Sequence, residues 1–257
     1  MGIVNLSDDS FSGDGLHGNI EAAIAQGRRM LEEGAHILDI GAESSRPGAK
    51  PVPAQKEIDL LLPVIEALRD CGAPLSIDTV KPEVMQAALA AGVDMINDIN
   101  ALRAPGALDL VAASKVGVCL MHMQGDPGTM QDDPHYIDIV AEVAEFLAER
   151  VAAAEAAGIA LNRIAVDPGF GFGKTLAHNT ALLRHLGELV VPGLPLLVGL
   201  SRKSVLGLLT GRAAPERVYA GVAAHVLAVE RGARIVRVHD VAATRDGLAI
   251  LQAVEDY

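Results

Sequence analysis

Short hydrophobic runs recur along the chain, and each run ends in polar residues that precede a loop and then a stretch with helical periodicity. Residues 19–35, 82–93 and 214–233 carry apolar side chains every three to four positions, which is typical of helices with one buried face. The pattern therefore predicts strands that alternate with helices. The predicted strands are residues 2–6 (GIVNL), 36–43 (HILDIGAE), 74–78 (PLSID), 94–99 (DMINDI), 117–122 (GVCLMH), 164–169 (IAVDPG), 196–201 (LLVGLS) and 235–240 (IVRVHD).

Glycine stands at the end of several helical stretches, just before the next strand. A helix that ends in the left-handed conformation favours glycine at that point, because glycine has no Cβ to clash with the backbone. These glycines therefore predict where the helices stop. They are Gly34, Gly72, Gly92, Gly158 and Gly232.

The alternation predicts an α/β protein with a single (β/α)8 TIM barrel that spans residues 1–257. Eight strand–helix units of about 32 residues each fit this fold, which typically needs about 250 residues. A doubly wound sheet is the alternative, but it usually has fewer strands and a glycine-rich turn after the first one. Residues 7–15 (SDDSFSGDG) lack the G-x-G-x-x-G spacing, and no linker or second domain is visible.

Composition indicates an aliphatic core, since half of the residues are hydrophobic while aromatic residues make up only 3% and tryptophan is absent. The net charge of −12 argues against binding nucleic acid or anionic lipid through a broad basic surface. The apolar runs are too short for a membrane helix, and no leader is visible. Cys71 and Cys119 match no metal or redox spacing. We expect a cytoplasmic protein with neither nucleic acid nor a membrane as partner.

Polar side chains gather where the predicted strands end. Because the active site of a TIM barrel lies at the carboxyl ends of its strands, these side chains should meet at one mouth. Asp and Asn are unfavourable in strands, so a coincidence repeated on nearly every strand is a poor explanation. The polar residues at these ends are Asn5, Glu43, Asp78, Asn97, Asp98, His122, Asp167, Ser201, Arg202, Lys203, Arg237 and His239.

The chemistry of this set favours two kinds of ligand group. Asp78, Asn97 and Asp167 can accept and donate along the amino and oxo edges of a flat heterocycle. Arg237 and His239 lie two residues apart on one strand and share a face, which indicates a phosphate site close to the final helix. We therefore expect a change at Arg237 to affect the anion and to leave the heterocycle bound. The alternative for Arg237 is a surface salt bridge.

Other common catalytic arrangements are missing from the sequence. No Ser-His-Asp spacing is recognisable, and no His or Cys cluster indicates zinc. Residues 167–175 (DPGFGFGKT) lack the spacing of a phosphate-binding P-loop, so their glycines are expected to allow a sharp turn close to a ligand. The pattern favours chemistry between two bound substrates, driven by positioning and charge.

Several motifs occur in one order over nearly the whole chain: MGIVNLSDDSFS, DIGAESSRPGA, SIDT, INDI, HMQGDPGTMQ, DPGFGFGK, GLSRKS and RVHDV. In this combination the chain closely resembles the dihydropteroate synthases of folate biosynthesis. The resemblance implies a transferase that joins 4-aminobenzoate to 6-hydroxymethyl-7,8-dihydropterin diphosphate and releases diphosphate. It implies a dissociative mechanism, in which diphosphate leaves before the amine attacks the pterin methylene cation. It also implies a homodimer that uses the last helices.

The resemblance implies roles for individual residues. It places the pterin on Asp78, Asn97, Asp167 and Lys203. It places the diphosphate on Asn5, Ser45, Arg46, Arg237 and His239, and a Mg2+ cofactor on Asn5. It places 4-aminobenzoate, or a sulfonamide that mimics it, against Phe11, Pro47, Phe172 and Ser201. The residues implied to be catalytic are Asp78, Asp167, Lys203, Arg237 and His239.

Two loops, residues 7–18 and 44–56, are expected to close over the diphosphate. The sequence departs from the family pattern in each of these loops and also just before the second one. Asp8 stands where the family has proline, Ser45 where threonine is usual, and Ala42 where glycine is usual. Three alternatives stay open: a corrinoid methyltransferase of related fold, an inactive pterin-binding homologue, and an interaction protein without enzymatic activity. The first would not need Arg46, Lys203 or the Arg237-x-His239 pair.

Overall fold

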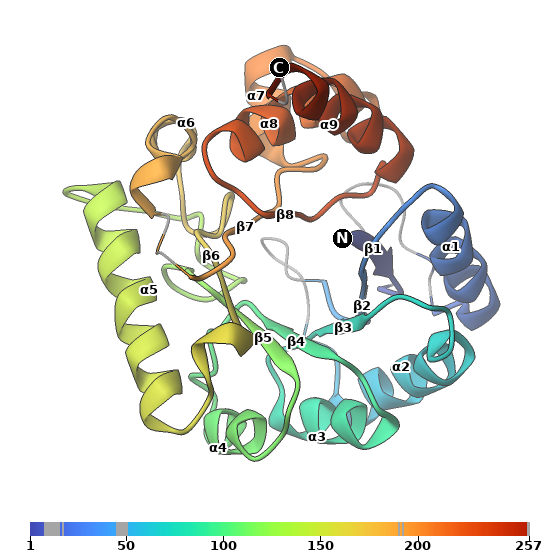
Figure 1. Cartoon of the computed structure of the whole chain (residues 1–257). Coiled ribbons are helices and arrows are strands. Elements are labelled where there is room, and N and C mark those ends of the chain that lie inside the picture. Colours follow the sequence, from blue (N-terminus) through green and yellow to red (C-terminus); the bar gives the residue numbers. More distant parts are fainter. Residues whose placement is uncertain (8–15, 17, 45–50, 190, 192, 256–257) are drawn as a thin grey trace.

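The computed structural model describes residues 1–7, 16, 18–44, 51–189, 191 and 193–255. Strands form a ring at the centre of the molecule, and helices surround it (Figure 1). The strands are β1 (Gly2–Asn5), β2 (Leu38–Gly41), β3 (Leu75–Asp78), β4 (Met95–Asp98), β5 (Gly117–Met121), β6 (Ile164–Asp167), β7 (Leu197–Val198) and β8 (Ile235–Val236). All eight lie within the runs that the hydrophobic pattern predicts.

The ring is closed by parallel pairing on every side. Strands β1 to β6 pair in chain order as one parallel sheet, and β7 pairs with β8. A bridge between Val166 and Leu196 joins β6 to the β7 side, and one between Gly2 and Val238 joins β1 to the β8 side. The Ile3 amide donates to the carbonyl of Val238 at 2.9 Å across this second junction. The predicted TIM barrel is confirmed, and the doubly wound alternative, which leaves two open sheet edges, is excluded.

The helices follow the strands on the outside of the ring. They are α1 (Ile20–Glu32), α2 (Ala54–Leu68), α3 (Pro82–Ala91), α4 (Ala107–Ala112), α5 (Ile139–Ala156), α6 (Leu176–Arg184), α7 (Ser204–Thr210), α8 (Val218–Glu230) and α9 (Val241–Glu255). Short 3-10 turns occupy Leu161–Arg163, Leu186–Leu189 and Ala214–Glu216. The connection from β7 to β8 thus holds two helices, α7 and α8.

Local sequence explains where several helices begin and end. The side chain of Asn19 accepts a hydrogen bond from the Ala22 amide at 3.0 Å and caps α1. Helix α3 starts at Pro82, where a missing N–H costs nothing, and ends at Ala91, followed by the C-cap Gly92 with φ of 89°. The other predicted stop glycines also have positive φ, as expected. Their φ values are 96° at Gly34, 84° at Gly72, 97° at Gly158 and 104° at Gly232.

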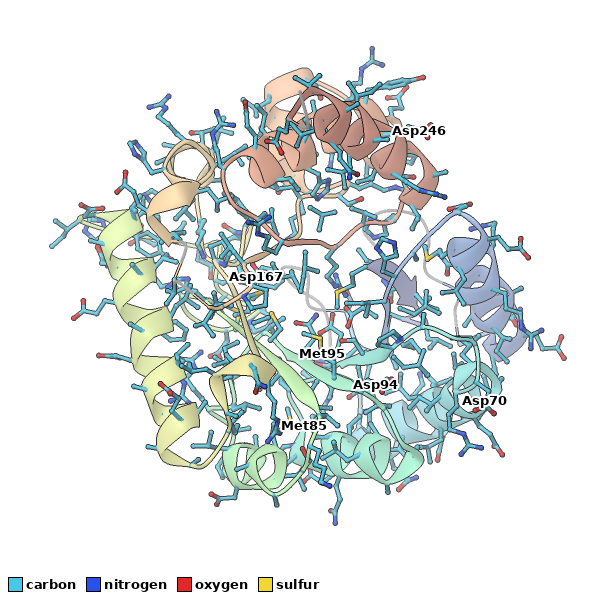
Figure 2. The ribbon with its side chains drawn as sticks, viewed as in Figure 1. Asp70, Met85, Asp94, Met95, Asp167 and Asp246 are labelled. Atoms are coloured by element: carbon cyan, nitrogen blue, oxygen red, sulfur yellow. The ribbon has the colours of Figure 1, made fainter. Side chains whose placement is uncertain are left out.

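Alternate side chains of each strand face the helices or the interior of the ring. Met85 of α3 belongs to the large aliphatic core between ring and helices, whereas Cys119, Ala165 and Leu197 pack together with Met95 inside the ring. Figure 2 shows this separation of Met85 from Met95. Among the described helices, none has both the length and the apolar character needed to cross a bilayer. The assignment of residues 1–257 to one domain stays a prediction.

Candidate functional site

The strand register brings the predicted polar ends together at one mouth of the ring. Asn5 pairs with Gly41, which in turn pairs with Asp78 of the next strand. Asp78 pairs with Asn97 one strand further on. Asp167 ends β6 and points into the ring in Figure 2. The ends of β3, β4 and β6 therefore present a carboxylate, an amide and a second carboxylate to the same space.

The structure describes most of the predicted site residues but not all. Four predicted site residues from the loops 7–18 and 44–56 lie outside the described residues: Phe11, Ser45, Arg46 and Pro47. The departure at Asp8 lies outside them as well. The predicted residues at the mouth that the structure describes are Asn5, Asp78, Asn97, Asp167, Phe172, Ser201, Lys203, Arg237 and His239.

Arg237 links two carboxylates across the ring. Its Nε donates to Oδ2 of Asp39 at 2.5 Å, and its Nη2 donates to Oδ2 of Asp78 at 2.7 Å. Burial alone would lower the pKa of Arg237, but the two carboxylates raise it above its ordinary value. Arg237 is therefore not a surface salt bridge. It is the cation of a three-member network that joins the residue just after β8 to β2 and β3.

Asp39 is the centre of that network, and sequence reasoning missed it. Its side chain is fully buried and also accepts hydrogen bonds from Ser76 Oγ at 2.6 Å and from Asn97 Nδ2 at 3.1 Å. Candidates were expected at strand ends, whereas Asp39 lies within β2. The available signal was a carboxylate between Leu38 and Ile40 in a run that is otherwise apolar.

Asp78 carries a charge that depends on pH near neutrality. Burial raises the pKa of Asp78 to about 7, because the attraction of Arg237 is outweighed by burial together with repulsion from Asp39 and other carboxylates. A ligand that donates hydrogen bonds to Asp78 would therefore favour the ionised form.

This raised pKa predicts a pH dependence of stability. The ordinary pKa of the Asp78 carboxyl is 3.8, so between pH 4 and pH 7 the folded state holds a proton that the unfolded state has lost. Stability should thus fall as pH rises across this interval, by on the order of 2–4 kcal/mol from this group. The Asp78→Asn protein should lose less stability over the same pH interval. Urea unfolding at pH 4.5 and pH 7.5 measures the difference.

Asp70, exposed just beyond α2, offers the matched control for this measurement (Figure 2). The Asp70→Asn protein should keep the pH slope of the unmodified chain. Equal slopes for Asp78→Asn and Asp70→Asn would show that Asp78 does not hold a proton in the folded state.

Asp167 and Lys203 form the second charged group of the mouth. Oδ1 of Asp167 accepts from the Gly169 amide at 2.7 Å. Burial raises the pKa of Asp167, and the nearby charge of Lys203 opposes this rise. Burial likewise lowers the pKa of Lys203 to about 8, against the attraction of Asp167. Nζ of Lys203 donates to the Phe170 carbonyl and lies 4.7 Å from the centre of the Phe172 ring.

Ser201 and His239 join the ends of β7 and β8. The backbone amide of His239 donates to Ser201 Oγ at 3.1 Å, and the His239 ring Nδ1 lies 2.9 Å from the same oxygen. Arg202, between Ser201 and Lys203, adopts φ of 57° and contacts both carboxylate oxygens of Asp240, at 3.1 Å and 2.6 Å. This turn places Ser201 and Lys203 at the mouth.

Asn5 ends β1 with its amide partly engaged. Its Oδ1 accepts from the backbone amide of Ser7 at 3.0 Å, which turns the chain away from the strand. A second lone pair of that oxygen remains for a ligand. Among the described residues, no group of three or more His, Cys, Asp or Glu side chains could hold a metal.

Asp98 is a strand-end residue whose side chain points away from the mouth. It was predicted to join Asn97 at the mouth, but alternation puts it on the helix side of β4. There its oxygens accept from the amides of Asn100 at 2.7 Å and Leu102 at 2.8 Å. Asp98 thus braces a turn in which Leu102 has φ of 56°.

Glu43 likewise makes contacts that stabilise the fold. Its carboxylate accepts from Nζ of Lys81 and from the Val52 amide, the latter at 3.0 Å. Lys81 also donates to Glu57, which is fully buried, at 2.5 Å. This cluster fixes the point where the second loop returns to α2.

The loop after β6 turns sharply, as its glycines predicted. Gly169 and Gly173 have φ of 67° and 60°. A Cβ at Gly169 would lie 1.9 Å from the His122 carbonyl oxygen, and one at Gly173 would lie 2.5 Å from that of Gln124. A side chain at either glycine would therefore meet the backbone after β5, and the approach of a ligand to this loop stays a prediction.

Comparisons with known proteins agree with this geometry. The family model described as pterin binding enzyme matches residues 1–239. A dihydropteroate synthase of Neisseria meningitidis serogroup B is 52% identical over 99% of this chain and 92% of its own length.

Solved structures show the same likeness. A Xanthomonas albilineans dihydropteroate synthase with 4-aminobenzoic acid is 57% identical, with a TM-score of 0.92 over 100% of this chain and 93% of its own. A Burkholderia cenocepacia dihydropteroate synthase complexed with 7,8-dihydropteroate is 50% identical, with a TM-score of 0.92 over 100% of this chain and 91% of its own.

Proposed function

The chain belongs to the dihydropteroate synthase family of pterin-binding enzymes, and we propose that the mouth of its barrel holds the two substrates side by side. The enzyme is a transferase that joins 4-aminobenzoate to 6-hydroxymethyl-7,8-dihydropterin diphosphate, giving 7,8-dihydropteroate and diphosphate. Membership in this family excludes the corrinoid methyltransferase and the interaction protein without enzymatic activity, and the assay described below tests the inactive homologue. Each part of the reaction can be assigned to particular side chains of the mouth.

The pterin ring binds between the two charged groups of the mouth. The observation that carries this assignment is the convergence of Asp78, Asn97 and Asp167 at neighbouring or facing strand ends. No described residue donates to Oδ2 of Asp167, so this oxygen is available to the amino edge of the pterin. Lys203 supplies a donor for the oxo edge. Asp39 does not touch the ligand in this assignment, and it holds Asn97 and Arg237 in place.

The charges of the mouth favour departure of diphosphate before attack. Asp78 and Asp167 in their ionised forms stabilise the positive pterin methylene that is left behind. Arg237 and His239, beside the start of α9, face the leaving diphosphate together with that helix N-terminus. The amine of 4-aminobenzoate is neutral and needs no strong base. The chain's task is therefore to orient the amine and to balance charge.

Asn5 fits a Mg2+ ion that binds together with the diphosphate. Its Oδ1 is a hard oxygen donor with one lone pair left, at the strand end beside β8. When bound, the ion would neutralise charge on the diphosphate oxygens. A single amide oxygen is a weak ligand, so affinity for the metal should depend on the diphosphate.

The 4-aminobenzoate binds against the loop after β6. Phe172 packs on a small cluster that includes Met121, Met123 and Met130, and it presents a partly exposed ring beside Lys203. Ser201 lies at the end of the neighbouring strand. In this assignment the ring of Phe172 forms one wall of the aminobenzoate pocket, and the proposed opposite wall, Phe11 and Pro47, lies outside the described residues.

We also infer a cytoplasmic homodimer that associates through the last helices. Apolar side chains stand exposed on α7, α8 and α9, and exposed apolar area of this kind is typical of an interface. They are Leu208, Leu209, Tyr219, Leu227, Ile250 and Val254.

One assay tests the reaction and the metal together. Purified protein is incubated with pterin diphosphate and 4-aminobenzoate, and both diphosphate and 7,8-dihydropteroate are quantified, with Mg2+ or with excess chelator. We expect the two products in equal amounts and a lower rate with chelator. Diphosphate released without dihydropteroate would identify a hydrolase, and an unchanged rate with chelator would remove Mg2+ from the proposal.

A further inference from the structure

The loop after β6 is held by side chains from several elements, each bound to one of its backbone groups. Asn179 of α6 accepts from the Gly171 amide at 2.7 Å through Oδ1. Side chains also donate to four successive carbonyls of this loop. The pairs are Lys203 on Phe170, Gln131 on Gly171, Lys174 on Phe172 and Tyr136 on Gly173. The loop is thus fixed residue by residue before any substrate arrives.

Lys174 is the unusual member of this set. Its side chain is buried, with 3% of the residue exposed, yet it contacts no carboxylate of the described residues within hydrogen-bonding distance. Its Nζ donates to the Phe172 carbonyl at 2.9 Å and lies 2.9 Å from Nδ1 of His122. Burial lowers the pKa of Lys174 to about 7 and that of His122 to about 3, so the His122 ring is neutral and its Nδ1 accepts.

An amine in such a place is costly unless all of its hydrogen bonds are made. A buried lysine could be replaced by an apolar side chain if filling space were its only task. Here its partners are the strand end at His122 and the backbone of Phe172. Lys174 therefore ties the end of β5 to the residue that forms the proposed aminobenzoate wall.

We propose that Lys174 is a positioning residue, which sets the place of the Phe172 ring and thereby the affinity for 4-aminobenzoate. The inference rests on the proposed role of Phe172 as a wall of that pocket. Lys174 does not touch the substrate, because its Nζ is directed at protein acceptors and the side chain is buried. The ring that it positions also lies against Lys203, so an ill-placed Phe172 would disturb both sides of the pocket.

A double-mutant cycle tests this route. The proteins are the unmodified chain, Lys174→Met, Phe172→Ala and the double variant, assayed for the KM of each substrate. Phe172→Ala should raise the KM for 4-aminobenzoate. Lys174→Met should raise it about 5- to 30-fold, as expected for the loss of one or two hydrogen bonds, and should change the KM for pterin diphosphate by less than about twofold. In the Phe172→Ala background, Lys174→Met should have no further effect on the KM for 4-aminobenzoate.

Two controls separate positioning from general damage. Lys115→Met changes an exposed lysine and should leave both KM values as they are. Lys174→Gln keeps a donor for one of the two acceptors. Its KM for 4-aminobenzoate should lie between that of the unmodified chain and that of Lys174→Met. If Lys174→Met does not fold, the same cycle is run with Lys174→Gln, with thermal unfolding measured for every variant.

The outcomes point to different failures. If Phe172→Ala leaves the KM for 4-aminobenzoate unchanged, the assignment of Phe172 to the pocket is wrong. If Phe172→Ala raises it but the Lys174 variant does not, the positioning role is overturned while the pocket stands. An equal rise in both KM values, or an undiminished effect of the Lys174 variant in the Phe172→Ala background, also overturns it.

Discussion

The Arg237→Met protein should lose about 3–5 kcal/mol of its free energy of unfolding at pH 8, since removing one partner of a buried ion pair leaves the others uncompensated. Asp39 and Asp78 would then be two carboxylates in one enclosed space with no guanidinium between them. The pKa of Asp78 should rise further, but at pH 5 this carboxyl holds a proton with or without Arg237, so the loss of stability should be smaller there. Urea unfolding at the two pH values measures both quantities.

The same substitution should weaken the binding of both halves of the pterin substrate. The sequence led us to expect an effect on the diphosphate alone, because Arg237 and His239 share a strand face. In the structure Arg237 also holds Asp78, which we propose to contact the pterin ring. Calorimetry measures the affinity of each variant for the pterin alcohol and for diphosphate, with Arg234→Met as the exposed control. Both affinities should fall for Arg237→Met and stay unchanged for Arg234→Met.

Two results would contradict these roles of Arg237. A loss of stability that is the same at pH 5 and pH 8 would mean that removing the cation does not raise the pKa of Asp78. Unchanged affinity for the pterin alcohol would mean that the Asp39–Arg237–Asp78 network does not support the pterin side of the mouth.

The Asp167→Asn protein should bind the pterin alcohol roughly two to four orders of magnitude more weakly. The amide can still accept from the Gly169 amide, so the loop after β6 keeps its anchor. In place of Oδ2 the variant has an NH2 group, which faces the donors of the pterin edge. Two charge-assisted hydrogen bonds of about 1.5–3 kcal/mol each are lost. Calorimetry gives the affinity, and thermal unfolding should show an intact fold.

Asp70→Asn again serves as the control, because it makes the same chemical change on the outer surface. A pterin affinity of Asp167→Asn within about threefold of that of Asp70→Asn would remove Asp167 from the pterin site. A large fall in the melting temperature of Asp167→Asn would instead assign Asp167 to the support of the loop.

Local signals in the sequence were sufficient for the fold. Each strand is marked by its apolar run, and several helix stops by a glycine such as Gly92, because these preferences act within a few residues. The strand ends indicated the mouth, including Asp78, Asn97 and Asp167, since parallel strands in a barrel must end at the same side.

The residues that sequence reasoning missed or misplaced differ in the side of the strand that they face. Asp39 and Asp98 both lie in apolar runs, yet one is inside the ring and the other faces the helices. The direction of each follows only once the register of the closed ring is known. The contact of Lys174 with His122 joins residues 52 positions apart in the chain, and no local pattern marks such a pair.

The salt bridges of Arg237 have a consequence for how the chain reaches its native state. Its partners Asp39 and Asp78 precede it by 198 and 159 residues, so they leave the ribosome long before it does. Until β8 is synthesised, an assembly of the first strands would enclose two carboxylates without their cation. Contacts of such long range form slowly, because the long chain between the partners must first be closed into a loop. The ring therefore cannot close before β8 has been made, and a nascent chain cut before Arg237 would remain open to chaperones and proteases.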